Sequence, residues 1–207
     1  MVRLYLVRHG CSVWNTEGRI QGQADPPLDV IGREQARRLA CRLCDDALVA
    51  VYTSPLQRAR ETADIIGQAL DVSVVPDGRL QEYDVGDISG LTWDQVAEQY
   101  PEVMQRWAED RGGLDIPLRL ANEEGSDPFR SRVVAAFDDI LERHAGESVG
   151  VVAHGGTLGT YLNHLIELRT WKSPFRFDNA SLSIVEVNSR RPRIVLLNDI
   201  CHLGGNS

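Results

Sequence analysis

The sequence predicts an α/β protein, a three-layer α/β/α sandwich with a mostly parallel central sheet. Short β-rich runs alternate along the chain with segments whose apolar residues recur at helical spacing, which is typical of β-α-β units. The 207 residues contain no sequence repeat, low-complexity tract or Ser/Gly linker. Because one domain of this length can bury a substantial core, we expect a single domain over residues 1–207.

Six runs rich in apolar and β-branched residues are the strand candidates. They span residues 3–7, 48–53, 72–75, 149–153, 181–187 and 194–197. The first four alternate with helical patterns and are expected to form the parallel part of the sheet. The last two can pair with each other around a turn at Asn188-Ser189-Arg190.

Four helices fit between these strands, over residues 32–43, 55–70, 130–144 and 157–168. The first and third carry apolar side chains along one stripe, which indicates helices packed against a core. At the second helix, Ser54 can act as the cap, Pro55 suits the first helical position, and Gln57 can close a capping box. The fourth helix follows a Gly-Gly pair.

Residues 79–128 do not fit this alternation. They include Trp93, Trp107, a Gly-Gly pair and several acidic residues, and only a short helix is expected within residues 92–107. We interpret this segment as a lid-like helical and loop excursion that packs over one end of the sheet and shapes a substrate pocket there.

Charge and composition argue against two classes of partner. The formal net charge is −8, from 22 basic and 30 acidic side chains, whereas proteins that bind nucleic acid through phosphate contacts usually carry a basic surplus. No apolar stretch approaches the roughly 20 residues of a membrane helix, and the first residues lack the pattern of a secretion signal. We therefore expect a cytoplasmic protein without a nucleic-acid or membrane partner, in which local arginines must attract any anionic substrate.

The four cysteines fit a reducing compartment. Cys41 and Cys44 have the spacing of half a zinc or redox motif, but no second pair follows them. They lie in a segment with helical apolar spacing, which favours two buried or half-buried thiols on one helix over a metal or redox site.

Polar clusters follow three of the predicted strands. Arg8-His9-Gly10 ends the first strand, Thr53-Ser54-Pro55 ends the second, and His154-Gly155-Gly156 ends the fourth. Ligands of open α/β sheets bind outside the carboxyl ends of the strands, so these clusters are expected to converge at one site.

The residue types at this expected site indicate a phosphate pocket. Arg8 lies beside His9, Arg58 falls in the first turn of the helix after Ser54, and the helix that begins after His154 offers its free N–H groups to an anion. Positive charge around two histidines opposes a metal site. His144 and His164 also lack Asp, Cys or Glu partners at ligand spacing, so we expect no metal and no cofactor.

Several separated motifs resemble the histidine phosphatase superfamily, the phosphoglycerate-mutase-like group. The matching residues are Arg8-His9-Gly10, Trp14-Asn15, Gly18-Arg19, Gln21-Gly22, Pro27-Leu28, Gly32, Gln35-Ala36, residues 54–59, Glu61-Thr62-Ala63 and residues 151–156. The resemblance runs in family order from the N-terminus to Leu203, over almost the whole chain.

This resemblance implies roles for individual residues. His9 would attack the phosphorus atom of a phosphomonoester as a neutral imidazole and become transiently phosphorylated. The residues that would bind the phosphoryl group are Arg8, Asn15, Gln21, Arg58, His154 and Gly155. For Asn15 and Gln21, hydrogen bonding within their own loop is an equal alternative.

The resemblance also implies an acid for the leaving group. Glu82, at the end of Arg79-Leu80-Gln81-Glu82, matches the family's acid and could afterwards activate the water that removes the phosphoryl group. Asp84 and Asp87 are rival assignments, and a solvated loop carboxylate is the alternative without function.

The compact segment after Glu82 favours a hydrolase over a mutase, because mutases of this group insert additional residues there. The C-terminal part resembles bacterial metal-independent phosphoserine phosphatases, at residues 177–181, Leu197-Asn198 and residues 201–204. The substrate implied is a small phosphorylated metabolite, phosphoserine first, with His202 contacting its carboxylate or else packing in the tail.

Other functions remain as alternatives to a phosphoserine phosphatase. They are a phosphoglycerate mutase, a broad-specificity, sugar-phosphate or α-ribazole phosphatase, and a phosphate-binding sensor without activity. The sensor would be expected to lack the nucleophile or the acid, and the sequence retains both. A homodimer through an edge strand or the C-terminal segment fits the resemblance, although no sequence pattern demonstrates it.

Two positions depart from the family pattern. Cys11 follows the first motif where Glu, Gln or Ala is more frequent, and it is either an oxidisable thiol or a passive small side chain. Glu124 can be matched to the glutamate of the family's Gly-Glu-Ser motif, in an uncertain register.

Overall fold

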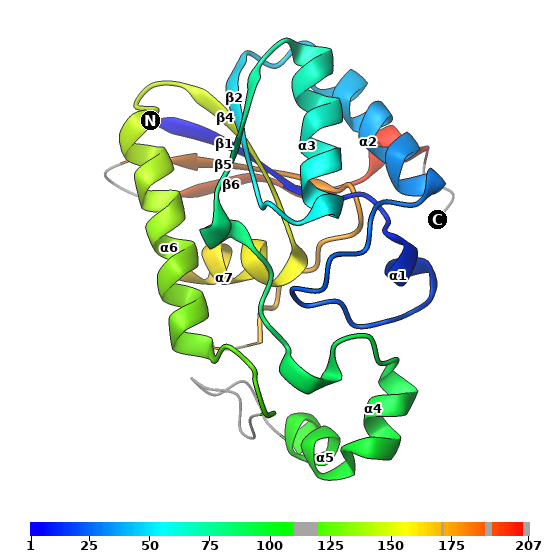
Figure 1. The fold of residues 1–207 in the computed structure, drawn as a ribbon. Coiled ribbons are helices and arrows are strands. Elements are labelled where there is room, and N and C mark those ends of the chain that lie inside the picture. Colours follow the sequence, from blue (N-terminus) through cyan, green and yellow to red (C-terminus); the bar gives the residue numbers. More distant parts are fainter. Residues whose placement is uncertain (110–119, 171, 189–191, 205–207) are drawn as a thin grey trace.

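The computed structural model describes residues 1–109, 120–170, 172–188 and 192–204, and it shows one six-stranded sheet (Figure 1). The strands are β1 (Val2–Arg8), β2 (Leu48–Thr53), β3 (Ser73–Pro76), β4 (Ser148–Ala153), β5 (Leu182–Val187) and β6 (Arg193–Asp199). Their order across the sheet is β3-β2-β4-β1-β5-β6. All six lie where the sequence predicts strands, and no end is shifted by more than two residues.

The sheet is mostly parallel, as predicted. β1 and β2 both run parallel to β4, and β3 runs parallel to β2. β5 and β6 are antiparallel additions at the other side, β5 against β1 and β6 against β5. The pairing of the last two strands is confirmed, while residues 189–191 of the predicted turn between them lie outside the described residues.

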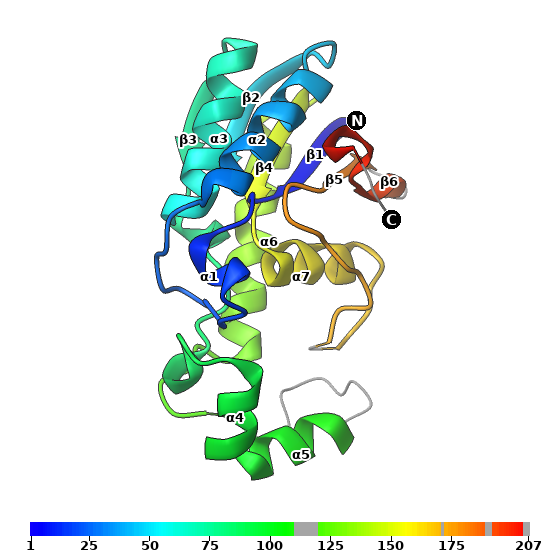
Figure 2. The same cartoon turned by 90° about the vertical axis from the view of Figure 1, so that its right-hand side faces the viewer.

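Helices cover both faces of the sheet and complete the three layers (Figures 1 and 2). The helices are α1 (Val13–Thr16), α2 (Val30–Arg42), α3 (Gln57–Leu70), α4 (Trp93–Gln99), α5 (Pro101–Glu109), α6 (Ser126–Arg143) and α7 (Gly155–Leu165). None of the helices in the described residues has both the length and the apolar character that a membrane span requires.

Alternate residues of β1 enter two different cores. Leu4 and Leu6 pack with residues of α6 and α7, whereas Tyr5 and Val7 pack with residues of α2 and α3. Successive side chains of a strand point to opposite faces, so a central strand covered by helices on both faces is apolar throughout. This double burial fixes the register of β1 and therefore the position of the residues that follow it.

The excursion has a small core of its own. Ile88, Val96, Val103 and Leu120 are buried together there. The figures show α4 and α5 lying beyond the end of the sheet at which β4 passes into α7 (Figures 1 and 2). Residues 110–119 of the predicted excursion lie outside the described residues.

Several predicted helix boundaries are wrong, for local reasons. The capping box at Ser54 and Gln57 does not form, because α3 begins at Gln57 and Asp25 accepts the hydrogen bond from the Gln57 backbone N–H. The single short helix expected in residues 92–107 is two helices, because Pro101 begins a new helix after α4 has ended at Gln99. α6 begins four residues earlier than predicted and α7 ends three residues earlier.

Candidate active site

Three strand ends bring the predicted site residues together. The backbone N–H of His9 donates to the carbonyl of Ala153 at 3.0 Å, and that of Ser54 donates to the carbonyl of Val152 at 3.1 Å. The loops after β1 and β2 are therefore both fastened to the end of β4, which leads into His154. The ring centroids of His9 and His154 lie 5.2 Å apart, and both side chains are buried.

The tautomer of His9 follows from the hydrogen bond of its Nδ1 atom. Its Nδ1 lies 2.7 Å from the carbonyl oxygen of Gly10, which can only accept a hydrogen bond. Nδ1 therefore carries the ring proton, and Nε2 keeps a lone pair. Burial, reinforced by the charges of Arg58 and Arg8, holds the pKa of His9 well below its usual value. His9 is thus a neutral imidazole with one nucleophilic nitrogen.

Two side chains that sequence reasoning did not assign fix the loop of His9. Thr62 Oγ1 accepts from the backbone N–H of Gly10 at 3.1 Å. Asn179 Nδ2 donates to the carbonyl oxygens of His9 and Gly10 at 3.2 and 3.3 Å. Both residues lie in segments that resemble the family, but only the folded geometry reveals their contacts with the nucleophile's backbone.

The two predicted arginines are buried and held by backbone carbonyls. Arg58 donates to the carbonyls of Ala24 and Gly22, each at 2.7 Å, and Arg8 donates to the carbonyl of Phe177. Burial lowers the pKa of Arg58 to about 10, an effect that the negative charge of Glu82 opposes. Burial also lowers the pKa of Arg8, again opposed by Glu82. Both guanidinium groups therefore lie near the Glu82 carboxylate.

His154 is neutral as well and is fixed by Ser54. Its Nε2 lies 2.8 Å from Ser54 Oγ, and burial together with the charge of Arg58 holds its pKa well below the usual value. Its Nδ1 is buried without a hydrogen-bond partner.

Three unpartnered polar atoms belong to this group of side chains. They are the Nε atoms of Arg8 and Arg58 and Nδ1 of His154. Buried polar atoms without a partner are rare in folded proteins and call for an explanation. Two guanidinium groups and an imidazole with unused nitrogens would be satisfied by an anion rich in oxygen acceptors, such as a phosphoryl group.

The Glu82 carboxylate caps the N-terminus of α7. It accepts from the backbone N–H groups of Gly156 at 2.9 Å and Thr157 at 3.1 Å. This places it beside His154, the residue that precedes α7. Its rivals point elsewhere, since Asp84 accepts from the backbone of Gly86 and Asp87 accepts from the side chain of Asn122. Of the three carboxylates, only Glu82 contacts the α7 N-terminus.

Asn15 and Gln21 are held within their own loop. Ser12 Oγ lies 2.9 Å from the side-chain oxygen of Asn15 and 2.8 Å from that of Gln21, so its single proton is shared between these two acceptors. Asn179 Nδ2 also donates to Asn15, which ties this loop to the backbone of His9. The hydrogen bonds that these side chains make are therefore those of the loop alternative, and their contact with phosphate stays a prediction.

Gly155 lies beside Arg8. A Cβ atom added at Gly155 would be 3.9 Å from Arg8 Nε, at ordinary contact distance. This agrees with the predicted place of Gly155 at the anion site, although its binding of phosphate stays a prediction.

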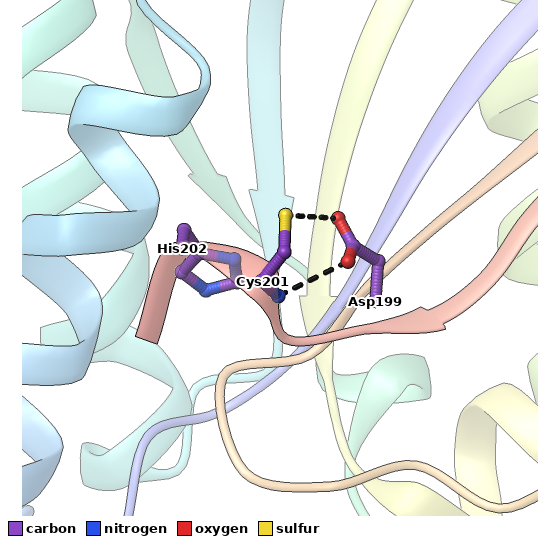
Figure 3. A group of neighbouring side chains, drawn as sticks. All are labelled: Asp199, Cys201 and His202. Carbon is purple, nitrogen blue, oxygen red and sulfur yellow. Dashed lines mark hydrogen bonds between the residues drawn. The ribbon is translucent and has the colours of Figure 1, made fainter. Parts of the chain in front are cut away.

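The hydrogen bond that His202 makes is one of tail packing, and its contact with the substrate carboxylate stays a prediction. Figure 3 shows His202 beyond the end of β6, next to Asp199 and Cys201. Its Nε2 donates to the carbonyl of Ala180 at 3.0 Å. The shallow pocket that it lines is otherwise formed by α2 residues, namely Glu34, Arg37, Arg38, Cys41 and Arg42. Positive charge there opposes a cation, and the hydrogen bond to Ala180 fits the tail-packing alternative.

Three further expectations are corrected or refined, on the Cys41 and Cys44 pair, on Cys11 and on Glu124. Cys41 and Cys44 are free thiols as predicted, but they are exposed and not buried. Cys11 is partly buried, near Thr16 Oγ1 at 3.5 Å, and burial raises the pKa of its thiol. Glu124 forms an ion pair with Arg132.

An apolar cavity of about 490 Å³ adjoins the Glu82 carboxylate. Gly156, which binds that carboxylate, forms part of its wall. Apolar side chains of the excursion line much of the rest, among them Val85, Ile88, Trp93 and Leu120. The part of the wall formed by α7 is polar, with Thr160, Asn163 and His164, and Glu123, Arg130 and Lys172 also line the cavity. The cavity therefore lies next to the N-terminus of α7, where the Glu82 carboxylate is bound.

Comparison with known proteins gives a consistent picture. The family model of the histidine phosphatase superfamily, branch 1, matches residues 4–200. Phosphoserine phosphatase 1 of Hydrogenobacter thermophilus is 36% identical over 99% of this chain and 95% of its own length. The metal-independent phosphoserine phosphatase of Arabidopsis thaliana is 35% identical, over 98% of this chain and 84% of its own length.

Two further proteins are similar to this chain over most of its length. The probable phosphoglycerate mutase GpmB of Escherichia coli is 32% identical, over 90% of this chain and 85% of its own length. The structure of YhfR from Bacillus stearothermophilus superposes with a TM-score of 0.88 at 32% identity, covering 98% of this chain and all of that one. The similarity therefore spans the whole fold, including the strand ends that carry the site.

Proposed function

Because this chain belongs to the histidine phosphatase superfamily and is a phosphoric monoester hydrolase, we propose that His9 carries the phosphoryl group during turnover. The observation that carries this proposal is the 2.7 Å contact between His9 Nδ1 and the Gly10 carbonyl. It leaves Nε2 as the ring's nucleophilic atom, in a residue whose lowered pKa keeps it neutral.

The first half-reaction transfers the phosphoryl group to His9. Nε2 of His9 forms a bond to phosphorus while the bond from phosphorus to the ester oxygen breaks. Glu82 gives its proton to the departing oxygen, so that an alcohol leaves in place of an alkoxide. Arg8, Arg58 and His154 hold the phosphoryl oxygens, and donors of this kind are worth about 3–4 kcal/mol each in the transition state.

The second half-reaction restores the enzyme. Water attacks phosphorus and gives a proton to the Glu82 carboxylate, while the bond between phosphorus and Nε2 breaks. Its electron pair returns to the imidazole, and phosphate leaves. The same carboxyl group serves as acid and then as base. Its hydrogen bonds at the α7 N-terminus, next to His154, support a place beside the reacting oxygens.

Rapid-quench mass spectrometry tests this mechanism. We expect an alkali-stable, acid-labile phosphoryl group on the peptide that contains His9, formed within one turnover of p-nitrophenyl phosphate. His9→Ala should abolish both label and turnover, whereas His144→Gln, at the far end of α6, should retain both. A phosphoryl group on any other residue, or a His9→Ala variant with wild-type activity, would overturn the proposal.

Phosphoserine is the substrate that the relatives support first, because two proteins at 35–36% identity over nearly this whole chain are named phosphoserine phosphatases. Comparing kcat/KM for phosphoserine, 3-phosphoglycerate, sugar phosphates and α-ribazole phosphate tests this assignment. We expect phosphoserine to give the highest kcat/KM. If another compound gives a kcat/KM at least tenfold higher, that compound replaces phosphoserine as the assigned substrate.

The apolar cavity beside Glu82 supports a second candidate, a broad-specificity phosphatase for esters with larger apolar groups. A serine would leave most of a cavity of about 490 Å³ unfilled, including its apolar surface. In that case kcat/KM should rise with chain length in a series of linear alkyl phosphates. A flat or falling series would favour phosphoserine.

We retain a homodimer as a proposal, with β6 as the contact. β6 is an edge strand, and its Val195 and Leu197 are 45% and 40% exposed. Light scattering of the purified protein should give twice the monomer mass. The Val195→Lys variant should give the mass of one monomer.

A cytoplasmic location is likewise proposed, and the four free cysteines support it. Fractionation of the native cells tests it, with the protein expected beside cytoplasmic marker enzymes.

A further inference from the structure

We propose that Arg132 is a positioning residue for catalysis, which holds the main chain of Glu82 so that its carboxylate faces the leaving oxygen. The inference rests on the proposed function in one respect, the role of Glu82 as the acid. Arg132 itself lies on α6 and is distinct from the arginines of the phosphate pocket.

All five N–H donors of Arg132 have partners. One terminal nitrogen donates to the carbonyls of Arg79 and Gln81, both at 2.7 Å. The other donates to the carbonyl of Glu82 at 2.9 Å and to Glu124 Oε2 at 2.8 Å, and Nε donates to Glu124 Oε1. A guanidinium group has no further donors, so its hydrogen-bonding capacity is used completely.

Three of these partners belong to the short segment that ends in the acid. No strand or α-helix holds Glu82, since the 3-10 turn before it ends at Leu80. The backbone carbonyls of this segment are instead gathered by one side chain of α6. Thr157 of α7 adds a hydrogen bond to the carbonyl of Gln81 at 3.0 Å, so the segment is fixed between two helices.

The ion pair with Glu124 ties this segment to the other end of the excursion. Glu124 and Asp84 are joined by backbone and side-chain hydrogen bonds of 3.1 and 3.4 Å, which close the excursion where it leaves and rejoins the domain. Arg132 and Glu124 are only 19% and 16% exposed, so solvent competes weakly for the pair. The clamp therefore links the geometry of the acid to the closure of the excursion.

A lysine could not replace this arginine. Its ammonium group has three donors on a flexible stem and cannot reach five acceptors in a planar fork. Arg132→Lys keeps the charge and most of the volume but releases carbonyls of residues 79–82. Glu82 would then sample several positions, and proton donation to the leaving oxygen would lose efficiency.

Two matched substrates separate this role from a merely structural one. Phenyl phosphate and p-nitrophenyl phosphate have similar shapes, but phenolate leaves poorly without a proton, whereas nitrophenolate needs little assistance. General acid catalysis typically contributes about 10²–10⁴-fold. For Arg132→Lys we expect kcat/KM to fall by at least tenfold with phenyl phosphate and by less than about threefold with p-nitrophenyl phosphate. Glu124→Gln should show the same pattern in weaker form.

A double-mutant cycle with Glu82→Gln completes the test. Once the acid is absent, Arg132→Lys should cause no further loss with phenyl phosphate, because the two residues act as one unit. Arg143→Met, at the C-terminal end of the same helix, is the matched control and should leave both esters unaffected. Equal losses with both esters, or additive losses in the cycle, would overturn the role of Arg132. A wild-type protein that does not hydrolyse p-nitrophenyl phosphate would instead refute the proposed function.

Discussion

Ser54 Oγ lies 2.8 Å from Nε2 of His154, a contact that joins the end of β2 to the end of β4. The serine hydroxyl also accepts a hydrogen bond from the backbone N–H of Leu56 at 3.3 Å, so its own proton can point to the histidine. His154 Nε2 is then the acceptor, and the ring proton sits on Nδ1, the buried atom without a partner. Ser54 thereby gives His154 the tautomer that can donate to a phosphoryl oxygen.

Replacing Ser54 by alanine should lower activity by releasing this tautomer. We expect kcat/KM for p-nitrophenyl phosphate to fall about tenfold, which corresponds to about 1.4 kcal/mol of transition-state stabilisation. Nitrogen NMR should show the proton of His154 shared between both ring nitrogens. Ser183→Ala is the control, since this buried serine accepts from the Asn198 backbone, away from the histidines. Wild-type turnover by Ser54→Ala would show that the tautomer does not depend on the serine.

The buried histidines predict how stability depends on pH. Burial lowers the pKa of His9 and His154 in the folded protein, while in the unfolded chain both titrate near 6.5. As pH falls below about 6.5 the unfolded chain binds protons that the folded protein does not, so the free energy of unfolding decreases. Each histidine contributes at most about 1.4 kcal/mol per pH unit.

Urea denaturation between pH 7.5 and pH 5 measures this effect. His154→Gln should flatten the dependence, because one of the two buried imidazoles is gone. Ser183→Ala, which removes no titratable group, should keep the wild-type slope. An unchanged slope in His154→Gln would mean that the folded protein protonates this residue readily.

The layered fold could be predicted from the sequence because β1, β2 and β4 are buried on both faces and read as apolar runs. The positions of helix ends were harder to predict from the sequence. The sequence before α3 has the composition of a capping box, yet the tertiary contact of Ser54 with His154 and that of Asp25 with the Gln57 backbone decide the boundary instead. Such contacts join residues far apart in the chain, which local patterns do not contain.

The site residues likewise fall into those that the sequence could assign and those that it could not. His9, Arg58 and His154 could be assigned because their motifs follow strands that end at one edge of the sheet. Thr62 and Asn179 could not be assigned, because they act through hydrogen bonds to the backbone around His9. For His202 the sequence left two alternatives open; its hydrogen bond to the Ala180 carbonyl fits tail packing, and its contact with substrate stays a prediction.

Chelators should leave the activity unchanged. In the proposed mechanism, the positive charge that a metal ion would supply comes from Arg8 and Arg58, both buried near the phosphate pocket. We expect kcat and KM for p-nitrophenyl phosphate to remain within error after dialysis against EDTA. Arg58→Lys should instead lower kcat/KM by about 10²–10³-fold, the usual result of losing one oxyanion donor. Activity lost in EDTA and restored by one divalent ion would contradict the metal-independent mechanism.

Gly156→Ala should displace the acid without disturbing the nucleophile. A Cβ atom at this position would lie 2.4 Å from Glu82 Oε1, a contact too short to persist, so the carboxylate must leave the N-terminus of α7. Alanine is more favourable than glycine within a helix, so the variant should remain folded. We expect kcat/KM to fall by about 10²-fold with phenyl phosphate and far less with p-nitrophenyl phosphate, because the nitrophenolate departs without a proton. Gly78→Ala is the control, since its Cβ would meet nothing within 4 Å. If Gly156→Ala hydrolyses phenyl phosphate at the wild-type rate, the carboxylate at this helix terminus is not the acid.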